Sequence, residues 1–551
     1  MPLSPAQPQS RLSTQIARKL FAFCSFLIVL PLFLACGGGD SGSTSTAPAE
    51  GSASAGGSKM STKPVVVSMP ADIQKLDPPQ PTDGNSLAVV AHIYDRLFDF
   101  DDTELNVVPG LVESYEISED GTRYTFKLRE DATFSDGSPV NAEAVKFTFE
   151  RIVDTEHPEH YAIAWTNDIL GDWFSHIETP DEYTAVFVLH RPFVPLLFNL
   201  AIPAASIVSP SHVKAMGSDR IISEPMGSGP YVLEEWKKDA YVRLRARDSH
   251  WRSTPKSRTI FFRVQKDANQ RMASLKRGEV HLVPVLSPET IGDRAALKDI
   301  EIIEQPFPSL GYVICNVEKG PLQSKELRQA LNYAIDRESI VNGVLEGTSI
   351  PSYGPLPPGM IGYRPLEEKA VQYTYDLEKA RALVKASGHE GATIKLLCFD
   401  ADRPYNTAGV RLAERLQEDY RQIGLDIDIE QMDFGGFLET VRQRTVHELA
   451  LSGWMADTGD PDNFIYYLFG SDTNRANYKN LDARRLMEEA QGEQDPERRA
   501  ALYAQAEDIV LEDAPAVFIN HAKRLKGKTT NLKGYKSHPI EVDRMWDVWV
   551  E

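Results

Sequence analysis

Cysteine is scarce in this sequence: the chain of 551 residues contains four. This excludes a small fold held together by disulfides, and a chain of this length can bury a large apolar core, divided into two or more lobes, without them. Positive charge is also in short supply, because 59 Lys and Arg residues face 79 Asp and Glu residues and the formal net charge is −20. A field of that sign repels phosphate backbones, so nucleic acid is not an expected partner.

The N-terminal region lacks an apolar run long enough to cross a membrane. Residues 20–35 form an apolar run of 16 residues, whereas a membrane-spanning helix needs about 20. Three basic residues (Arg11, Arg18 and Lys19) and no acid precede this run. The order is typical of an export signal that is cleaved, and removal of residues 1–35 changes the net charge to −20 − 3 = −23.

The apolar run ends in Leu32-Phe33-Leu34-Ala35-Cys36, which resembles the lipobox of bacterial lipoproteins, although Phe33 stands where Leu is usual. In such proteins the cysteine is acylated and becomes the mature N-terminus, so Cys36 is the predicted lipidation site. An ordinary signal peptide with an incidental Cys36 is the alternative. Residues 37–59 hold no aromatic or large aliphatic side chain and cannot form a core. As a flexible tether they span roughly 25 Å.

Strand and helix patterns are mixed in the rest of the chain, and no repeat of 20–50 residues is visible. Polar and apolar side chains alternate over residues 123–128 and 183–189, which predicts half-buried strands. Asn141, between them, is placed to cap a helix. These elements predict a mixed α+β insertion of about 120 residues. The chain then holds predicted helices within 324–345, a proline-rich loop at 351–358 and a helix from the cap Asp376 to Gly388.

The clearest pattern lies between residues 392 and 454, where strand and helix periods follow each other as β-α-β-α-β. Such a unit forms a parallel sheet with right-handed crossovers, and ligands bind beyond the carboxyl ends of its strands. Arg403 follows the first strand, and Asp457, Asp460 and Asp462 follow the third. The predicted strands are 393–399, 425–430 and 448–454, and the predicted helices are 410–420 and 434–444.

An enzyme is one interpretation of these acids, because Asp457-Thr458-Gly459 is the triplet that aspartic proteases use in pairs. The only comparable tripeptide lies in the tether, where a nucleophile or paired acid cannot be held in place. Zinc-protease, phosphate-loop and nucleophile-elbow patterns are also absent. A calcium hand starting at Asp460 lacks its glycine and its final acid, since Ile465 and Ser471 occupy those places. No catalytic residue, metal or cofactor is therefore predicted.

A binding cleft for a short peptide is the second interpretation. The ammonium and carboxylate of two extended residues lie about 7 Å apart, so Asp457 is placed to pair with the first and Arg403 with the second. Arginine suits a carboxylate because its planar fork donates two parallel hydrogen bonds. Ser452 and Gly453 offer extended backbone for pairing with a peptide, and Trp454 offers an apolar wall. Solvated loop charges or a structural salt bridge remain the alternative for Arg403 and Asp457.

At these residues the chain resembles the family 5 solute-binding proteins of ATP-driven importers, which carry peptides, nickel, haem and some sugars. The dipeptide-binding branch is the most similar, through Arg403-Pro404-Tyr405-Asn406, Gly453-Trp454 and Asp457. This resemblance implies that Asp457 holds the α-amino group, that Arg403 holds the α-carboxylate and limits ligand length, and that Tyr405 also contacts the ligand. Further family motifs lie at residues 76–78, 93–97, 119–122, 134–137, 227–231, 328–336 and 459–464.

The resemblance implies an α/β, periplasmic-binding-protein-like two-lobed clamp with an extra third domain, class II-type and cluster C. It closes about a hinge around its ligand. The implied partners are a short peptide, a membrane permease with its cytoplasmic ATPase, and the membrane itself through the lipid anchor. A monomer in the cell envelope is expected. The alternatives are a longer oligopeptide, haem, a nickel chelate or an oligosaccharide. The implied boundaries are 60–104, 228–308 and 519–551 for lobe I, 105–227 for the extra domain and 309–518 for lobe III.

The remaining cysteines follow from these assignments. Cys24 leaves with the export signal and Cys36 is the predicted lipid site, so only Cys315 and Cys398 remain in the body. Each lies in an apolar, strand-like run. Buried free thiols are therefore predicted, with a disulfide as the alternative in an oxidising compartment.

Overall fold

The structure, a computed structural model, describes residues 60–160, 169–400, 403–540 and 543–551. The predicted export signal, the lipidation site Cys36 and the tether lie outside the described residues. Across the described ranges, none of the helices has the length and apolar character needed to cross a bilayer.

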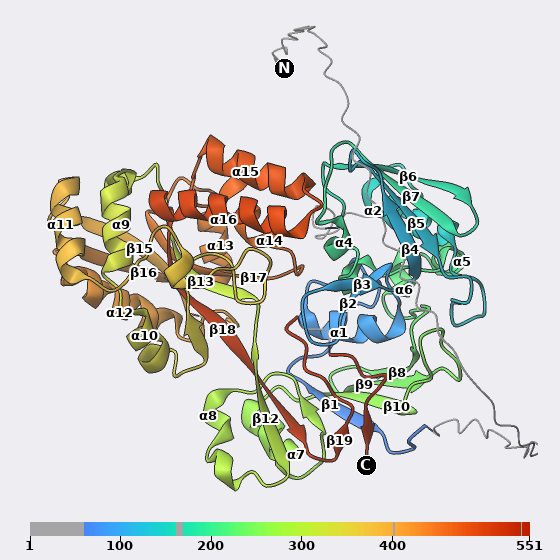
Figure 1. Cartoon of the computed structure of the whole chain (residues 1–551). Helices are drawn as coiled ribbons and strands as arrows, with labels where there is room; N and C mark the ends of the chain where they lie inside the picture. The colour runs from blue at the N-terminus through green and yellow to red at the C-terminus, as the bar shows by residue number, and fades with distance from the viewer. Residues whose placement is uncertain (1–59, 161–168, 401–402, 541–542) are drawn as a thin grey trace, which may run out of the picture. The chain divides into compact units, whose positions relative to one another are not determined.

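A mixed sheet of twelve strands forms the framework of the described residues (Figure 1). β1 pairs in parallel with β10, and the antiparallel strands β9 and β8 extend the sheet to that edge. In order across the sheet, the strands are β16 (Asp426–Met432), β15 (Thr393–Phe399), β17 (Leu449–Met455), β13 (Ser309–Cys315), β18 (Ala516–Thr529), β11 (Leu282–Val283), β1 (Val65–Met69), β10 (Thr259–Val264), β9 (Tyr241–Ala246) and β8 (Tyr231–Lys237). β12 (Ile300–Pro306) and β14 (Ser349–Pro351) also pair with β18.

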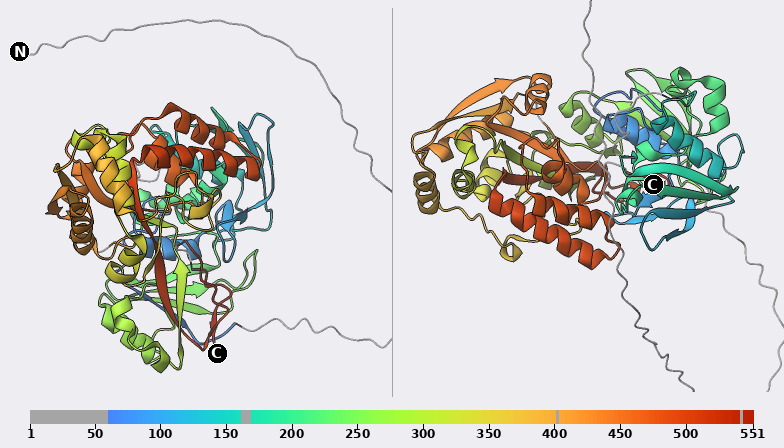
Figure 2. Two further views of the ribbon diagram at one scale, coloured as in Figure 1. Left: turned by 60° about the vertical axis from the view of Figure 1, so that its left-hand side comes forward. Right: turned by 90° about the horizontal axis from the view of Figure 1, so that it is seen from above.

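β18 is the longest strand and joins the two ends of this sheet. Its first residues, up to Asn520, pair with β13, and its last residues, from Lys523 to Thr529, pair with β12. Figures 1 and 2 show it as the long red strand that runs from β13 toward β12. The predicted boundary between lobe III and lobe I therefore falls within one continuous strand.

The predicted β-α-β-α-β unit is confirmed. β15 pairs in parallel with β16 over its whole length and with β17 at Leu396 and Leu397. Between them lie α12 (Gly409–Arg421) and α13 (Phe434–Arg442). The helix before this unit, α11 (Leu377–Ser387), is capped by Asp376 and ends at Gly388, whose φ of 74° is the left-handed conformation that glycine tolerates best.

The insertion also has its predicted strands and helix. Four antiparallel strands form a second sheet in the order β4-β5-β7-β6, and Asn141 caps α2 by accepting a hydrogen bond from the Ala144 N–H. The strands are β4 (Val112–Ile117), β5 (Arg123–Leu128), β6 (Phe174–Asp181) and β7 (Thr184–Leu189), and the helices of this region are α2 (Ala142–Val153), α4 (Leu196–Asn199), α5 (Pro210–Met216) and α6 (Ser218–Ile221).

The other helices cover the large sheet and its loops. The predicted helices within 324–345 are confirmed as α9 (Lys325–Tyr333), α10 (Arg337–Ser339) and the π-helical η4 (Ile340–Val344). Figure 1 shows α15 and α16 side by side, and they pack closely. The remaining α- and π-helices of the described residues are α1 (Gly84–Ile93), α7 (Ala268–Lys276), α8 (Pro288–Ile291), α14 (Asp462–Ile465), the π-helical η6 (Tyr466–Gly470), α15 (Leu481–Gly492) and α16 (Pro496–Asp513).

The apolar core is not divided along the predicted domain boundaries. The largest buried cluster includes Phe126 and Phe187 of the second sheet together with Tyr312 and Phe518 of the large sheet. A separate cluster fills the region around β1 and β10. The boundaries of lobe I, the extra domain and lobe III remain a prediction. Cys315 and Cys398 are both buried and free.

Candidate functional site

The loop after β15 and the end of β17 form the candidate site. Because β15 and β17 are parallel, their carboxyl ends lie at the same edge of the sheet. The loop closes on itself, since the Arg403 N–H donates to the Asn406 carbonyl and the Asn406 N–H donates to the Arg403 carbonyl, both at 2.9 Å. The Asn406 side chain then accepts from the Ala408 N–H at 3.1 Å, just before α12 begins. These contacts fix the loop that carries Arg403.

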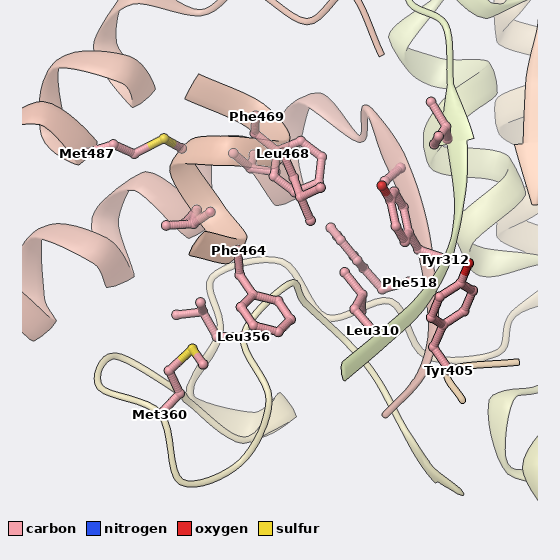
Figure 3. Packing of buried hydrophobic residues seen from close by; sticks show 14 of the residues in the cluster. Leu310, Tyr312, Leu356, Met360, Tyr405, Phe464, Leu468, Phe469, Met487 and Phe518 are labelled. Carbon is pink, nitrogen blue, oxygen red and sulfur yellow. The ribbon is translucent and has the colours of Figure 1, made fainter. Parts of the chain in front are cut away.

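Tyr405 seats this loop on the sheet. Its ring lies directly against Gly453 of β17, where a β-carbon would come within 1.9 Å of the ring. Gly453 is paired with Gly311 of β13, and a β-carbon on Gly311 would come within 3.1 Å of the Tyr405 carbonyl. Asn520 of β18 donates to that carbonyl at 3.1 Å. Figure 3 shows Tyr405 beside the strand that carries Leu310 and Tyr312. The close approach that Gly453 permits is thus made by Tyr405.

The Arg403 guanidinium stacks on an aromatic ring and lines a cavity. Its central carbon lies 3.3 Å from the centre of the Phe434 ring, at the start of α13. The Nε of Arg403 is buried and has no hydrogen-bond partner among the described residues. The cavity that Arg403 lines has a volume of about 510 Å³. A guanidinium N–H buried without an acceptor is costly, so this arrangement favours a ligand that supplies one.

The cavity wall comes from both predicted lobes and carries more positive than negative side chains. Residues 285–289 and 522–525 belong to the range predicted for lobe I, and residues 344–349 and 403–411 belong to lobe III. The charged side chains of the wall are Arg403, Arg411, Lys523 and Arg524 on one hand and Glu289 and Glu346 on the other. Positive groups are concentrated here although the chain as a whole is strongly acidic, which favours an anionic group in the cavity.

The end of β17 is held by one asparagine and one tyrosine. The Asn463 side-chain oxygen accepts from the Trp454 indole N–H at 3.0 Å and from the Asp457 backbone N–H at 3.2 Å. Tyr467 stacks on Trp454 with ring centres 4.4 Å apart. Ser452 is almost fully buried. These contacts orient the strand end and the turn that carries Asp457.

The other two acids of this turn have structural partners. Asp460 is buried and forms a two-pronged ion pair with Arg499 of α16, at 2.7 and 2.8 Å. It also accepts from the Asp462 N–H at 2.9 Å, and Asp462 accepts from Gln491 at 2.9 Å. Within the ranges that the structure describes, no group of three or more His, Cys, Asp or Glu side chains is arranged to hold a metal ion.

Three of the six predicted ligand residues lie together at the cavity. Arg403 and Tyr405 line it, and Gly453 supports Tyr405. Trp454 at the end of β17, Asp457 in the turn after it and the buried Ser452 lie outside the lining of this cavity.

Sequence reasoning missed Phe434, Asn463, Tyr467 and Arg475, whose guanidinium lies 5.9 Å from the centre of the Trp454 ring. A signal existed for two of them. Asn463 belongs to a family motif already noted, and Phe434 starts the helix after the strand next to β15.

Comparison with known proteins identifies the family. The model for bacterial extracellular solute-binding proteins, family 5 Middle, matches residues 106–476. The chain belongs to the family 5 extracellular solute-binding proteins. This family consists of binding proteins that serve transport and are not enzymes. Membership of this family also confirms the predicted two-lobed clamp fold.

The named relatives of this family 5 protein bind different solutes. A dipeptide-binding protein of Escherichia coli K12 is 33% identical over 482 residues, which are 83% of this chain and 89% of that protein. Heme-binding protein A of Haemophilus influenzae is 30% identical over 483 residues, 83% and 87% of the two chains. The solved structure of the periplasmic binding protein DppA of Helicobacter pylori, in complex with the peptide STSA, is 28% identical with a TM-score of 0.74, covering 89% of this chain and 98% of that one. The resemblance to the dipeptide-binding branch is thus confirmed.

Proposed function

We propose that this family 5 protein captures dipeptides or short peptides with free termini and delivers them to the permease of an ABC importer. The observation that carries this proposal is the half-buried Arg403 side chain, which lines a cavity of about 510 Å³ and whose buried Nε–H lacks an acceptor among the described residues. A ligand carboxylate would accept from this guanidinium through two parallel hydrogen bonds. The positive side chains around it would strengthen that interaction.

The ligand ammonium would lie at Asp457. Its turn follows β17, the strand against which Tyr405 places the Arg403 loop. The two charges of a dipeptide are about 7 Å apart, so a ligand held at both ends would lie along the end of β17 at Trp454, since the Tyr405 ring already covers Gly453. Arg403 would then limit the length of the ligand, because a peptide cannot extend beyond a carboxylate that is bound there.

Delivery would begin with export and anchoring. Residues 1–35 would be removed as a signal, Cys36 would carry the lipid, and residues 37–59 would tether the body at the membrane surface. Closure of lobes I and III on the ligand would create the surface that the permease recognises. We expect the protein to act as a monomer in the periplasm or on the outer face of a membrane.

The role of Arg403 is tested by calorimetry with Ala-Ala. We expect Arg403→Ala to weaken binding by at least about tenfold, since a hydrogen bond to a charged group contributes about 1.5–3 kcal/mol. Arg411→Ala is the matched control, because Arg411 lines the same cavity but is exposed and paired with Glu346 at 3.1 Å. Its affinity should stay within about fivefold of the parent value. Unchanged binding by Arg403→Ala, in a folded protein, would refute the assigned role.

The role of Asp457 requires a change in the ligand as well as in the protein. Asp457→Asn should weaken binding of Ala-Ala by about tenfold or more because the ligand ammonium loses its counter-charge. N-acetyl-Ala-Ala should bind poorly to the parent and should lose little more in the variant. If the parent binds the acetylated and free peptides equally well, the ligand does not place its amine at Asp457.

A haem ligand is the second candidate, because one relative of 30% identity is a heme-binding protein. If haem is the ligand, titration with haemin would shift the Soret absorbance band of the haem. Ala-Ala would neither produce nor reverse that shift. A longer peptide is distinguished by comparing Ala-Ala with tetra-alanine in the same calorimeter. The remote alternative of a peptidase predicts cleavage products in mass spectra after incubation with peptide, and we expect none.

A further inference from the structure

A second cavity lies beside the turn that carries Asp457. Its volume is about 390 Å³, and its wall comes from residues 171–199, within the predicted extra domain, and from residues 458–491. Trp173 and Phe193 stack in parallel at 4.4 Å on one side, and Tyr466 and Tyr467 of η6 lie on the other. Four aromatic side chains with few aliphatic neighbours form a wall suited to an amphipathic group with a polar or cationic end.

The charged groups of this cavity leave one carboxyl without a cation. Arg191 is the single cationic side chain of the lining, and it is committed elsewhere, because it donates to the Gln491 side chain at 2.7 Å and pairs with Asp172 at 3.4 Å. Gln491 in turn donates to Oδ1 of Asp462 at 2.9 Å. Among the described residues, Oδ2 of Asp462 accepts no hydrogen bond. The nearby Arg499 is already paired with Asp460 through both its terminal nitrogens.

The protonation of Asp462 reflects this lack of a counter-charge. Burial, and after it the Asp460 carboxylate, raises the pKa of Asp462 to about 7, in spite of Gln491, Arg499 and Arg191. A cation in the cavity would favour the ionised carboxylate and lower this pKa toward its ordinary range. The site is thus electrostatically prepared for a positive group that the chain itself does not supply.

The cavity adjoins the proposed position of the ligand ammonium. Thr458 and Asn463 line it, and Asn463 also holds the Asp457 backbone and the Trp454 indole. Tyr467 lines the cavity and also stacks on Trp454. In a peptide the first side chain leaves from the carbon next to the ammonium, so a ligand with its amine at Asp457 would present that side chain here.

We propose that this cavity receives the side chain of the first residue of the peptide and prefers a basic one, Lys or Arg. The ammonium or guanidinium would pair with Asp462, and the side-chain methylenes would pack on the aromatic wall. This inference rests on the proposed function, because it takes the ligand amine to lie at Asp457. It adds a preference at the first position, which the Arg403 cavity does not provide.

The test compares four dipeptides by calorimetry at pH 8: Lys-Ala, norleucyl-Ala, Ala-Lys and Ala-norleucine. Norleucine matches the length of lysine and lacks its charge. We expect Lys-Ala to bind about tenfold more tightly than norleucyl-Ala, as close charge pairs in binding sites commonly do, whereas Ala-Lys should gain little over Ala-norleucine. An equal gain at both positions would mean that the net negative charge of the protein attracts any basic peptide, and it would overturn the proposal.

Asp462→Asn identifies the carboxyl that is responsible. In this variant the ratio of the Lys-Ala and norleucyl-Ala affinities should fall to about one, while Ala-Ala binding stays near the parent value. Asp131→Asn, which removes the same charge from the surface outside the cavity, should keep the ratio. The parent ratio should also rise from pH 6 to pH 8 as Asp462 ionises. The charged or titratable groups around Asp462 are Asp460, Arg499, Arg191, Tyr466 and Tyr503.

The outcomes separate this inference from the function on which it rests. If Ala-Ala binds but Lys-Ala and norleucyl-Ala bind equally well, the peptide function stands and the basic pocket is refuted. If no dipeptide binds, the proposed function fails and the pocket assignment fails with it. If Asp462→Asn keeps the preference for Lys-Ala, another acid is the partner and the assignment is wrong.

Discussion

Replacing Gly453 by alanine should displace the Arg403 loop without touching Arg403 itself. The added methyl carbon would lie 1.9 Å from a ring carbon of Tyr405, whereas ordinary contact begins at 3.4 Å, so the ring must move by at least 3.4 − 1.9 = 1.5 Å. The neighbouring strands leave little room, because Tyr405 is 8% exposed and its carbonyl is hydrogen-bonded to Asn520. Overpacking of this kind costs about 1–3 kcal/mol in the free energy of unfolding.

The same displacement should weaken ligand binding. Tyr405 lies in the tight loop that two backbone hydrogen bonds between Arg403 and Asn406 close, so we expect a shift of the ring to move the guanidinium away from a bound carboxylate. Loss of a charge-assisted hydrogen bond costs about 1.5–3 kcal/mol, which corresponds to about a tenfold to hundredfold loss of dipeptide affinity. Urea unfolding measures the first effect, and calorimetry with Ala-Ala measures the second.

Two controls make the prediction sharp. A β-carbon on Gly343 meets no atom within 4 Å, so Gly343→Ala should change stability by less than about 0.5 kcal/mol. Tyr405→Ala removes the ring, and adding Gly453→Ala to it should cost nothing further, which gives a large coupling energy in a double-mutant cycle. If Gly453→Ala behaves like Gly343→Ala in both assays, Tyr405 does not position the loop as argued.

Two further predictions concern groups that are buried near the site. Asp460→Ala leaves Arg499 buried without its partner and should lower the free energy of unfolding by about 3–5 kcal/mol. Glu178→Ala, at an ion pair whose side chains are more than 40% exposed, should lower it by less than about 1 kcal/mol. Urea unfolding curves that coincide for the two variants would contradict this prediction. Burial raises the pKa of Cys315 to about 12 and that of Cys398 to about 11. Peptide mapping after treatment with iodoacetamide at pH 8 should therefore find both thiols unmodified in the native protein and modified in urea. Labelling of the thiols in the native protein would show that they are accessible and would contradict this prediction.

The elements of the sheet around the site were predictable because their patterns are local. Strand 393–399 and the helix after Asp376 follow from alternation and capping within a few residues, and the structure places them as β15 and α11. The insertion of β13 between β17 and β18 is not local, since β13 lies more than a hundred residues before each of them along the chain. Single-sequence periodicity carries no information about such pairing.

The site shows the same division between local and distant contacts. The position of Arg403 after a parallel strand was predictable, but its stacking on Phe434 and the seat of Tyr405 on Gly453 depend on residues 31 and 48 positions away along the chain. The acids after β17 show the same limit. Asp457, Asp460 and Asp462 follow one strand in the sequence, but Asp460 is neutralised by Arg499, which no local pattern connects with it.

β18 has a mechanical consequence for a clamp built in this way. One strand of 14 residues is hydrogen-bonded to β13 at one end and to β12 at the other, so the two halves are joined by a continuous rod instead of a slack loop. At about 3.3 Å per residue each half of the rod is a lever of about 23 Å. A small bend near His521 and Ala522 would therefore become a larger movement at the far ends of the strand. Substitutions in this joint would shift the balance between open and closed forms, and at His521, which lies outside the lining of the Arg403 cavity, they would do so without changing a residue of that cavity.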